Sequence, residues 1–575
     1  MEIRESLEAI IDAAIDAARA DGSLELAEAP QAALERPRDE ANGDWASTVA
    51  LRVSKLAHKS PREIAQIIVD HIPENDMIAS VEIAGPGFIN IRLSDAVLQG
   101  VVREVREEGD NFGRGTIPEG ERYVNLEYVS ANPTGPFHVG HGRWASLGDA
   151  MARVMRHGGY DVYEEYYIND HGNQMDVFGN SVNVRYQQLL GRDVEMPEAC
   201  YGGAYVKDIA QDIIDRDGDK WLSVSDEERV EAFREMAYDM TLKNQREVLA
   251  NFGTTFDKWF SERSLYVEDE NGESAVSRSL DAMREKGYLY EKDGALWFRS
   301  TDLGDDKDRV LIKGDGEATY FMSDVAYHYD KMMRGFDHLI DLWGADHHGY
   351  IKRCECMLEA WGWPGALEVQ LGQLVNLFRD GKAVRMSKRT GEMITFEELI
   401  DEVGVDATRY LMLSRSADQP IDFDIEVAKK KDASNPVYYV QYAHARICSI
   451  LRKAADEADA AAVEAGEMTM GELAEKIIPE DCDLTPLTHP SELALMRKMA
   501  DFGNLIALAA RDRAPFRLTH YAQDLASLFH QFYTNCHVLT DDADVQTARL
   551  ALCDATRIVL ALTLNLLGVS APVKM

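Results

Sequence analysis

The chain has 575 residues, too many for one hydrophobic core, and we expect about three or four domains. Its 100 acidic and 61 basic residues give a net charge of −39, which argues against a simple nucleic-acid binder because phosphate contacts need lysine and arginine. The longest apolar stretch, near residues 558–569, is too short to span a membrane. The seven cysteines include no Cys-x-x-Cys pair, which is typical of a reduced cytoplasmic protein without a zinc ribbon.

The first part of the chain, residues 1–115, is predicted to form a separate α+β domain. Apolar residues recur at helical spacing in several segments, and two alternating runs flank Gly85-Pro86-Gly87, which indicates a hairpin. The predicted helices span residues 3–20, 46–57, 61–72 and 97–107, and the predicted strands span residues 81–83 and 88–93.

A strand, a tight turn and a helix follow in residues 124–157. Proline and glycine mark the turn, and the helical pattern begins at His138-Val139-Gly140-His141. The N–H groups at a helix start attract phosphate, and Gly140 lets a nucleotide approach the backbone closely. A helix entry with two incidental histidines is the alternative. The unit predicts the nucleotide site of an open α/β sheet.

Strands and helices then alternate to about residue 391, with two interruptions. Polar residues 169–174 and Gly344–Gly349 each follow a predicted strand, where a parallel sheet meets its ligand. The predicted strands span residues 162–168, 339–343 and 369–377, with a helix over 350–361. We therefore expect a Rossmann-type parallel-sheet domain over 116–391 with insertions near 183–240 and 265–316, a helical linker region over 392–430 broken by a strand at 421–424, and an all-helical domain over 431–575.

Two motifs carry a resemblance to a known family. Residues 130–143, Ser-Ala-Asn-Pro-Thr-Gly-Pro-Phe-His-Val-Gly-His-Gly-Arg, resemble the first signature of class I aminoacyl-tRNA synthetases in the form found in arginyl-tRNA synthetases. Arg385-Met386-Ser387-Lys388 resembles the second signature, usually Lys-Met-Ser-Lys. Without the first signature, the alternative interpretation would be a solvated basic loop. Cations there would neutralise the charge that develops as pyrophosphate leaves. The resemblance implies catalytic roles for His138, His141, Lys388 and, secondarily, Arg385, and ATP contacts from His138, Gly140, His141, Gly344, Asp346, His348, Met386, Ser387 and Lys388.

Arginine as a substrate needs carboxylates for its guanidinium, preferably in a bidentate arrangement. Residues 319–328 resemble the Tyr-x-x-x-Asp motif that lines the family's arginine pocket, and Glu127 ends the first strand. A helix N-cap is the alternative role for Asp324. Where the family often has a glutamine, this chain has Asp346 or His347, a departure from the pattern. The expected arginine contacts are Glu127, Asn132, His141, Tyr320, Asp324, Asp346 and His347.

The two ends of the chain resemble the family's tRNA-binding domains. Residues 42–47 are similar to part of the N-terminal domain, which contacts the tRNA elbow, and residues 436–447 and 566–575 are similar to the helical anticodon-binding domain. Tyrosines there are expected to stack on unpaired bases, although Tyr438 and Tyr442, one turn apart, also fit a core aromatic stripe. The expected tRNA contacts are Asn42, Tyr439, Tyr442 and Met575.

The resemblance covers nearly the whole chain and implies an arginine–tRNA ligase. Such an enzyme joins L-arginine to tRNA(Arg) through an arginyl-adenylate, releases AMP and pyrophosphate, and generally needs tRNA for activation. We expect Mg²⁺ to arrive with ATP rather than at a dedicated metal site, and we expect a cytoplasmic monomer without membrane contact. A cysteinyl or glutamyl synthetase is one alternative, disfavoured by the missing zinc-type cysteines. A non-catalytic RNA-binding relative is another, disfavoured by His138, His141 and Lys388.

The acidic residues are spread along the chain rather than collected in a tail, which favours adaptation to concentrated salt over the alternative that the acidity excludes nucleic acid as a partner. A chain this acidic must still bind tRNA, so we expect local positive charge near the two signatures and the anticodon-binding domain. The arginines expected to supply it are Arg143, Arg389, Arg409, Arg415, Arg446 and Arg452. The sequence thus predicts a halophilic enzyme.

Overall fold

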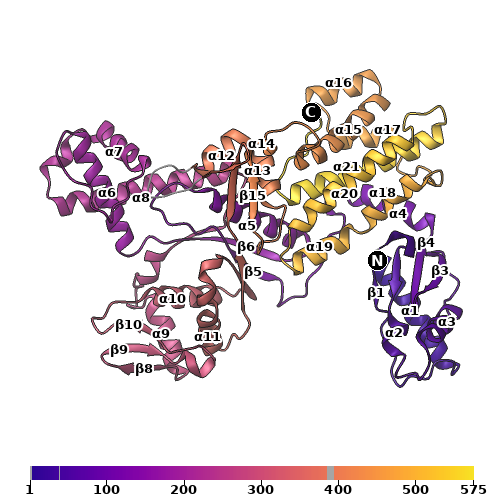
Figure 1. Cartoon of the computed structure of the whole chain (residues 1–575), viewed down its shortest axis with the longest axis horizontal. Coiled ribbons are helices and arrows are strands. Elements are labelled where there is room, and N and C mark those ends of the chain that lie inside the picture. The colour runs from indigo at the N-terminus through magenta and orange to yellow at the C-terminus, as the bar shows by residue number, and fades with distance from the viewer. Residues whose placement is uncertain (1–2, 38, 385–393) are drawn as a thin grey trace.

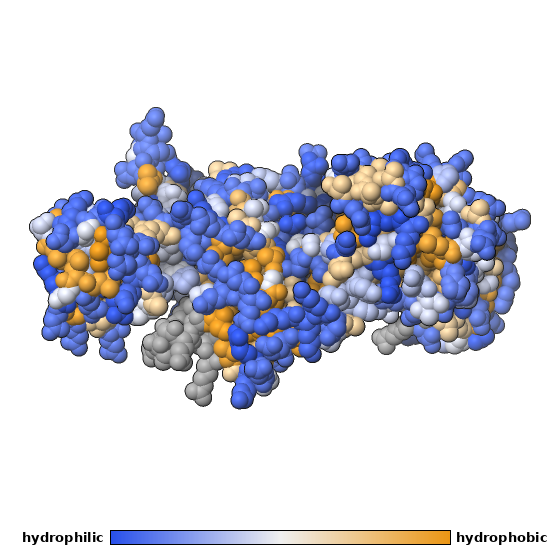
Figure 2. All heavy atoms as spheres, turned by 90° about the horizontal axis from the view of Figure 1, so that it is seen from above, coloured by the Kyte–Doolittle hydropathy of each residue, from blue (hydrophilic) through white to orange (hydrophobic). Residues whose placement is uncertain are grey.

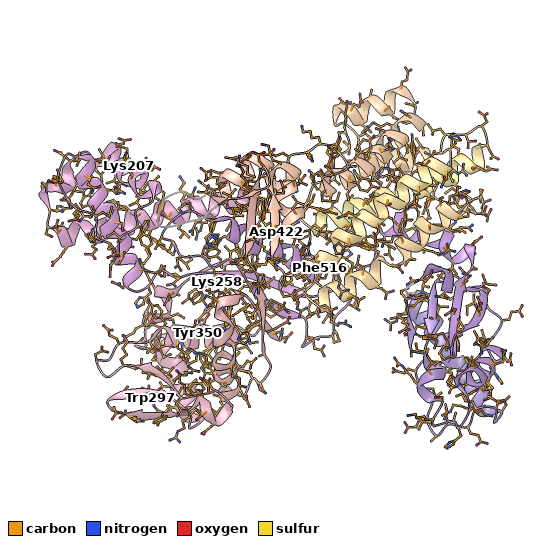
Figure 3. The ribbon with its side chains drawn as sticks, in the orientation of Figure 1. Lys207, Lys258, Trp297, Tyr350, Asp422 and Phe516 are labelled. Carbon is orange, nitrogen blue, oxygen red and sulfur yellow. The ribbon has the colours of Figure 1, made fainter. Side chains whose placement is uncertain are left out.

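The computed structural model describes residues 3–37, 39–384 and 394–575 of the chain. Figure 1 shows a central sheet from which two insertions extend at the left, a helical bundle at the upper right and an N-terminal domain at the lower right. In Figure 3, Lys207 marks the upper insertion, Trp297 the lower insertion and Phe516 the helical bundle. The face in Figure 2 is mostly hydrophilic, and apolar side chains gather on it toward the middle of the molecule.

The N-terminal domain is built on a four-stranded antiparallel sheet in the order β1-β2-β4-β3. The helix predicted over residues 46–57 is wrong in its first part. Trp45–Ser47 forms strand β2 and pairs with Ile89–Ile91, and only Val49–Val53 is helical, because pairing with a neighbouring strand overrides local propensity. The elements are α1 (Ile3–Ala20), β1 (Leu34–Glu35), η1 (Glu40–Asn42), β2 (Trp45–Ser47), α2 (Val49–Val53), α3 (Pro61–Asp70), β3 (Ile78–Ala84) and β4 (Phe88–Leu93).

The central sheet has five parallel strands in the order β12-β11-β5-β6-β7. The chain proceeds from β5 to β6 and β7 on one side and later returns to β11 and β12 on the other. The strand order therefore reverses between β5 and β11, and an open α/β sheet binds its ligand at the carboxyl ends of its strands at such a point. The elements are β5 (Tyr123–Glu127), α5 (Val139–His157), β6 (Asp161–Ile168), β7 (Lys258–Ser261), β11 (His338–Gly344), η6 (Ala345–Tyr350), α11 (Ile351–Trp361) and β12 (Leu367–Gly372).

Two insertions separate these strands. The first is a helical arm in which α8, a helix of 26 residues, runs from the tip of the arm back to the sheet (Figure 1). The second combines helices with a three-stranded sheet in the order β10-β9-β8. The elements are α6 (Asn173–Leu189), α7 (Ala204–Asp217), η3 (Lys220–Ser223), α8 (Asp226–Asn251), η4 (Glu262–Tyr266), α9 (Ala275–Glu285), β8 (Leu289–Lys292), β9 (Ala295–Phe298), η5 (Ser300–Leu303), β10 (Arg309–Ile312) and α10 (Tyr320–Met333).

Residues 369–377, predicted as one strand, belong to two strands in different sheets. Strand β12 ends at Gly372, and β13 (Val375–Arg379) pairs with β14 (Lys382–Ala383) and in parallel with β15 (Ile421–Asp424). Gly372, the last residue of β12, packs directly on Trp144, where an added Cβ would overlap the indole ring. The change of direction brings β13 toward the start of α5.

The C-terminal part is a helical bundle onto which α4 (Asp95–Glu108) of the N-terminal part packs through α18 and α21. Arg106 on α4 pairs with Asp554 on α21 at 3.2 Å, so residues far apart in the sequence share one core. Among the described residues, no helix combines the length and the apolar character needed to cross a bilayer. The helices are α12 (Phe396–Val403), α13 (Val405–Met412), α14 (Ile425–Ala428), α15 (Pro436–Ala454), α16 (Glu457–Ala465), α17 (Met470–Ile477), α18 (Pro490–Ala500), α19 (Phe502–Arg511), α20 (Phe516–Asn535) and α21 (Ala543–Leu566).

Close packing of α5 on β5 is tested by Gly148→Ala. An added Cβ at Gly148 would overlap the Tyr128 ring, and such overpacking typically costs about 1–3 kcal/mol of unfolding free energy. The matched control is Gly100→Ala in α4, where an added Cβ meets no atom within 4 Å and alanine improves helix propensity by about 0.5–1 kcal/mol. Thermal unfolding followed by circular dichroism should give a lower midpoint for the first variant only. Equal midpoints would contradict this packing.

Candidate functional site

The site begins at a strained turn after β5. Val129 and Ser130 have φ values of 68° and 39°, in the left-handed region that non-glycine residues rarely adopt. Side chains hold the turn in place, because Ser130 Oγ donates to Glu127 Oε1 at 3.0 Å and accepts the backbone N–H of Tyr167 at 3.1 Å. The strain is therefore kept at the switch point of the sheet, where a ligand is expected.

A glutamine from the helical arm is hydrogen-bonded to the same turn. Gln245 on α8 is fully buried, and its Nε2 donates to the carbonyls of Asn132 and Gly135 at 3.1 and 3.0 Å. Tyr166 O–H donates to Gln245 Oε1 at 3.3 Å. Sequence analysis missed Gln245, because its partners lie more than 100 residues away and no local pattern points to them.

The two histidines of the first signature lie together at the start of α5. His138 is the N-cap residue, and its backbone N–H donates to His141 Nδ1 at 3.1 Å. An accepting Nδ1 places the proton of a neutral imidazole on Nε2. The rings stack with centroids 3.6 Å apart, and an added Cβ at Gly140 would come within 2.8 Å of the His138 ring. The local sequence thus fixes the imidazoles beside the positive end of the helix.

The predicted second signature, Arg385, Met386, Ser387 and Lys388, lies outside the described residues, as does Arg389. The chain on either side of this signature is hydrogen-bonded to the rest of the domain. Val384 donates its backbone N–H to the carbonyl of Leu377 at 2.8 Å, and Phe396 donates to the carbonyl of Phe137 at 2.9 Å. Thr395 also forms a β-bridge with His138. The chain that leaves residue 393 is therefore bonded directly to the first signature.

Beside the turn lies a buried network of charges. Lys331 on α10 has no exposed surface, and its Nζ lies 2.6 Å from Glu127 Oε2 and 2.8 Å from Asp341 Oδ1. His328, one turn earlier on α10, lies 3.1 Å from Asp341 Oδ2. Burial works to lower the pKa of Lys331, but the two carboxylates outweigh it and raise that pKa. The ammonium thus bridges the end of β5 and the middle of β11.

Asp324 differs from these carboxylates because its side chain makes no hydrogen bond and no ion pair within the described residues. It lies on the same stripe of α10 as His328 and Lys331. Burial raises the pKa of Asp324 to about 7; nearby His328 opposes the rise, while Glu262 and Glu127 add to it. Thr319 is the N-cap of α10, so the alternative role of Asp324 as a helix cap is wrong.

Burial also raises the pKa of Glu262 and of Glu127, and Lys331 opposes the rise at Glu127. For Asp341 burial acts in the same direction, but Lys331 and His328 outweigh it and hold that pKa at about 2. The cations within the network, Lys331 and His328, are therefore already paired with Glu127 and Asp341.

The other residues expected at the arginine or ATP site lie around the same edge of the sheet, in contact with solvent. Tyr320 begins α10 and is 72% exposed, and the Asn132 side chain is exposed while its carbonyl is held by Gln245. Asp346 and His347 lie in η6 at the end of β11 and pair with each other at 3.6 Å. Gly344 ends β11, and His348 follows in η6 and is exposed.

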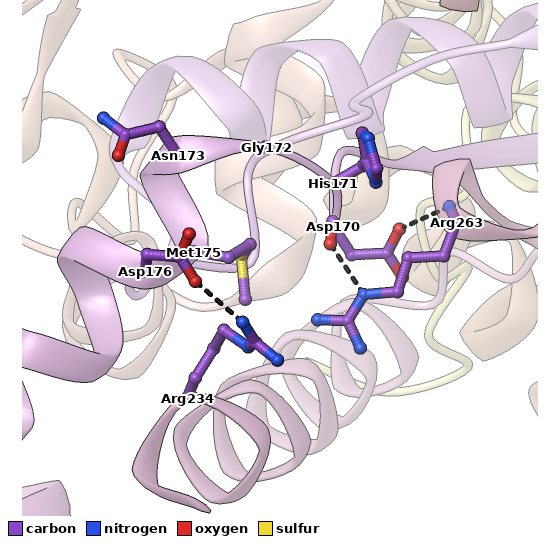
Figure 4. A pocket seen from close by; sticks show the side chains of 8 residues that line it. All are labelled: Asp170, His171, Gly172, Asn173, Met175, Asp176, Arg234 and Arg263. Atoms are coloured by element: carbon purple, nitrogen blue, oxygen red, sulfur yellow. Dashed lines mark hydrogen bonds and ion pairs between the residues drawn. The ribbon is translucent and has the colours of Figure 1, made fainter. Parts of the chain in front are cut away.

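An open cavity of about 370 Å³ adjoins the network at the end of β6 (Figure 4). Its two arginines already have acidic partners, since Arg234 pairs with Asp176 at 2.7 Å and Arg263 pairs with Glu235 at 2.7 Å. His171 stacks on Tyr266, with ring centroids 4.4 Å apart. The cavity is lined by Asp170, His171, Gly172, Asn173, Met175, Asp176, Arg234 and Arg263, several of which lie in the polar segment predicted to face a ligand.

Aromatic side chains gather on the C-terminal bundle at α15 and α20. Tyr442 is 37% exposed, and the Arg446 guanidinium lies 4.9 Å from its ring centroid and 4.9 Å from that of Tyr533. Tyr439 packs on His530 with centroids 5.0 Å apart. Sequence analysis missed Tyr533 and His530, because they lie on a different helix. At the remaining expected tRNA contacts, Asn42 is exposed in η1 and Met575 is 50% exposed.

Two arginines expected to attract tRNA lie in the interior. Arg143 and Arg409 have no exposed surface, and the four hydrogen bonds of Arg143 go to the backbone carbonyls of Gln373, Leu374, Ser416 and Gln419. The expectation is therefore wrong for these two residues, whose charge stabilises loops instead of meeting phosphate. Among residues 3–37, 39–384 and 394–575, no group of three or more His, Cys, Asp or Glu side chains is arranged to hold a metal ion.

Comparison with known proteins gives a consistent picture. Three family models match in order: the arginyl tRNA synthetase N terminal domain at residues 2–93, the catalytic domain of class I (R) tRNA synthetases at 112–447, and the DALR anticodon binding domain at 440–575. An arginine–tRNA ligase of Heliobacterium modesticaldum is 45% identical over 574 residues, covering 100% of this chain and 99% of that protein. One from Listeria monocytogenes is 46% identical over 555 residues, covering 96% of each.

Solved structures agree with this match. A structure described as an arginyl-tRNA synthetase from Campylobacter jejuni is 34% identical and superimposes with a TM-score of 0.74, covering 84% of this chain and 100% of that one. The arginyl-tRNA synthetase of Thermus thermophilus, at 21% identity, shares the fold with a TM-score of 0.73 over 100% of both chains. The resemblance found in the sequence is confirmed, and the chain belongs to the arginyl-tRNA synthetase family of class I aminoacyl-tRNA synthetases.

Proposed function

We propose that the protein joins L-arginine to tRNA(Arg) through an arginyl-adenylate, with conversion of ATP to AMP and pyrophosphate. The observation that carries this proposal is Asp324, a carboxylate without a cation in a buried acidic network. A guanidinium is charged at every accessible pH and binds a carboxylate through two parallel hydrogen bonds. Arginine therefore supplies the positive charge that Asp324 lacks.

The charges around Asp324 call for one guanidinium, because the other two carboxylates already have a cation. Lys331 neutralises Glu127 and Asp341 in part, and His328 adds to the neutralisation of Asp341. Both oxygens of Glu127 already accept hydrogen bonds, from Ser130 and Lys331. We therefore assign the direct ion pair with arginine to Asp324 and let Glu127 line the pocket. Asn132, His141, Tyr320, Asp346 and His347 complete the proposed arginine site around the same edge of the sheet.

The proposed reaction needs no protein nucleophile. The arginine carboxylate attacks the α-phosphate of ATP, and the bond to pyrophosphate breaks. His138 and His141, with the helix start at Gly140, hold the phosphates and the charge that develops on them. Lys388, with a lesser role for Arg385, is proposed to meet the leaving pyrophosphate, because Thr395, which follows these residues in the chain, forms a β-bridge with His138. We place Gly344, Asp346, His348, Met386 and Ser387 around the rest of ATP.

In the second proposed step, the 2′-hydroxyl of the terminal adenosine of tRNA attacks the arginyl carbonyl and AMP leaves. We place Mg²⁺ on the phosphates of ATP, as part of the substrate, because Glu127 and Asp341 are already bonded to Lys331. In the anticodon-binding domain, Tyr439, Tyr442 and Met575 are proposed to contact the anticodon. In the N-terminal domain, Asn42 is proposed to contact the tRNA elbow. Each stacked base contributes about 1–3 kcal/mol.

We further propose the domain limits drawn from the sequence, with a tRNA-contacting domain over 1–115, a catalytic domain over 116–391, a linker region over 392–430 and an anticodon-binding domain over 431–575. The packing of α4 on α18 and α21 holds the first and last of these domains together within one chain, and we propose that the protein is a monomer. We propose a cytoplasmic location, because all seven cysteines are free and six of them are buried.

The net charge of −39 supports a halophilic enzyme. Buried carboxylates such as Asp149, Glu165 and Asp341 outnumber the buried basic side chains among the described residues, but most of the acidic surplus still lies on the surface. Molar salt reduces the Debye length to about 3 Å and so screens repulsion within the surface and between the surface and tRNA.

The assignment of arginine to Asp324 is tested by Asp324→Asn and by pH. The variant keeps the size of the side chain but loses the charge, so the KM for arginine should rise by about two orders of magnitude or more, while the KM for ATP stays near wild type. Because only the carboxylate form pairs with guanidinium, the wild-type kcat/KM for arginine should increase as the pH rises through about 7. The variant should lack this increase. A wild-type arginine KM in Asp324→Asn would contradict the assignment.

The buried bridge is tested by Lys331→Met, which leaves Glu127 and Asp341 without their ammonium. Removing one partner of a buried ion pair typically costs about 3–5 kcal/mol of unfolding free energy. The control is Lys476→Met, which breaks a solvent-exposed pair with Asp459 at 2.6 Å and should leave the thermal midpoint unchanged. Urea and thermal unfolding measure the stability of both variants. Equal stability of the two variants would show that the buried bridge contributes nothing.

The salt hypothesis is tested by a KCl titration from low to molar concentration, followed by circular dichroism and by the rate of arginine–tRNA formation. Both the melting temperature and the charging rate should increase with salt, because screening relieves the repulsion among the acidic side chains. Full activity together with an unchanged melting temperature at low salt would contradict halophilic adaptation.

A further inference from the structure

A buried arginine lies where three parts of the chain meet. Arg409 on α13 donates from Nη1 to Asp149 Oδ2 on α5 at 2.7 Å, and from Nε to the carbonyl of Phe252, the C-cap residue of α8, at 3.0 Å. Its Nη2 donates to the Thr254 hydroxyl at 3.0 Å, and Nη1 also reaches the carbonyl of Leu567, the C-cap residue of α21, at 3.4 Å. One guanidinium therefore joins the signature helix, the arm and the anticodon-binding domain.

A second arginine repeats this connection. Arg153 on α5 pairs from Nε with the same Asp149 Oδ2 at 2.8 Å. Its Nη2 donates to the carbonyl of Gly253 at 3.3 Å, and its Nη1 donates to Asn565 Oδ1 on α21 at 3.4 Å. The backbone is shaped for this junction, because Gly568 has a φ of 67° and an added Cβ there would overlap the Arg409 guanidinium. Two sets of hydrogen bonds, which share Asp149, thus link the same three segments.

The arm carries this connection to the reacting groups. Helix α8 ends at the junction, and Gln245 lies on it about two turns before Phe252. Gln245 is the residue that holds the carbonyls of Asn132 and Gly135 in the signature turn. A continuous α-helix transmits a displacement of one end to the other, so the position of the junction sets the position of the turn.

We propose that Arg409 is a positioning residue that couples the seating of the anticodon-binding domain to the geometry of the first signature. It touches neither arginine nor ATP. It acts through Asp149, which fixes the signature helix, and through Phe252 and Thr254, which fix α8 and thereby the grip of Gln245. The inference rests on the proposed arginine–tRNA ligation and adds to it a route by which the domain that holds the tRNA sets the turnover of the distant site.

A second contact of α13 distinguishes coupling through Arg409 from a role in which α13 only holds two domains together. Asp406, also on α13, accepts the backbone N–H of Ser570 at 3.0 Å and Gln441 Nε2 at 2.8 Å. It therefore ties α13 to the same C-terminal bundle, but it makes no bond to α5 or α8. If Arg409 merely held two domains together, loss of Asp406 would have a similar effect.

The test compares the kinetics of arginine–tRNA formation in full-length variants. Arg409→Lys keeps a positive charge for Asp149 but cannot bond four acceptors with one ammonium, so kcat should fall about tenfold while the KM for tRNA stays within about twofold of wild type. Asp406→Asn should keep a wild-type kcat. Gln245→Met should lower kcat like Arg409→Lys, and the double variant should be no slower than the slower single variant, because both changes loosen the same turn.

Circular dichroism checks that each variant is folded. If Arg409→Lys fails to fold, Thr254→Val takes its place, since it removes one acceptor of Arg409 and leaves the arginine unchanged. A wild-type kcat in the tested variant, an equal loss in Asp406→Asn, or effects that multiply in the double variant would overturn the coupling. Failure of the wild-type enzyme to charge tRNA with arginine would instead overturn the proposed function, so the two failures are distinguishable.

Discussion

The site depends on one buried ammonium. Lys331 lies between Glu127 at the end of β5 and Asp341 on β11, and these are the two strands between which the order of the sheet reverses. A carboxylate pair at this position without a cation would repel and would take up protons. Because Lys331 comes from α10, the bridge also fixes the helix that presents Asp324. The structure thereby pairs two carboxylates with an internal cation, whereas the side chain of the third, Asp324, has no ion pair among the described residues.

Much of the site is readable from the sequence, because it is encoded in continuous segments. The strand, turn and helix of the first signature, the two histidines, and Asp324 in its short motif are all local patterns. The residues that position them are not local. Lys331 bonds a residue 204 positions away, and Arg409 bonds one 260 positions away, so only the fold brings them together. A buried arginine and a ligand-binding arginine look alike in one sequence, which is why Arg143 and Arg409 were expected on the surface.

The errors in secondary structure have the same cause. Residues 46–47 and 373–374 have no local signal that would separate them from their neighbours. Trp45–Ser47 is a strand because β4 lies beside it, and residues 369–377 are divided because β12 pairs with β11 whereas β13 pairs with β14 and β15. In both places, contacts between distant segments decide the local conformation, as expected when tertiary packing competes with weak propensity.

The central claim is that Asp324 is the carboxylate that binds the substrate guanidinium, and calorimetry of arginine binding in two buffers of different ionisation enthalpy tests it most directly. Because burial raises the pKa of Asp324 to about 7, binding near pH 7 should release a fraction of a proton as the carboxyl group ionises. Citrulline, which has the same shape without the charge, should bind far more weakly and release no proton. Arginine binding without proton release, or equal affinity for citrulline, would contradict the account.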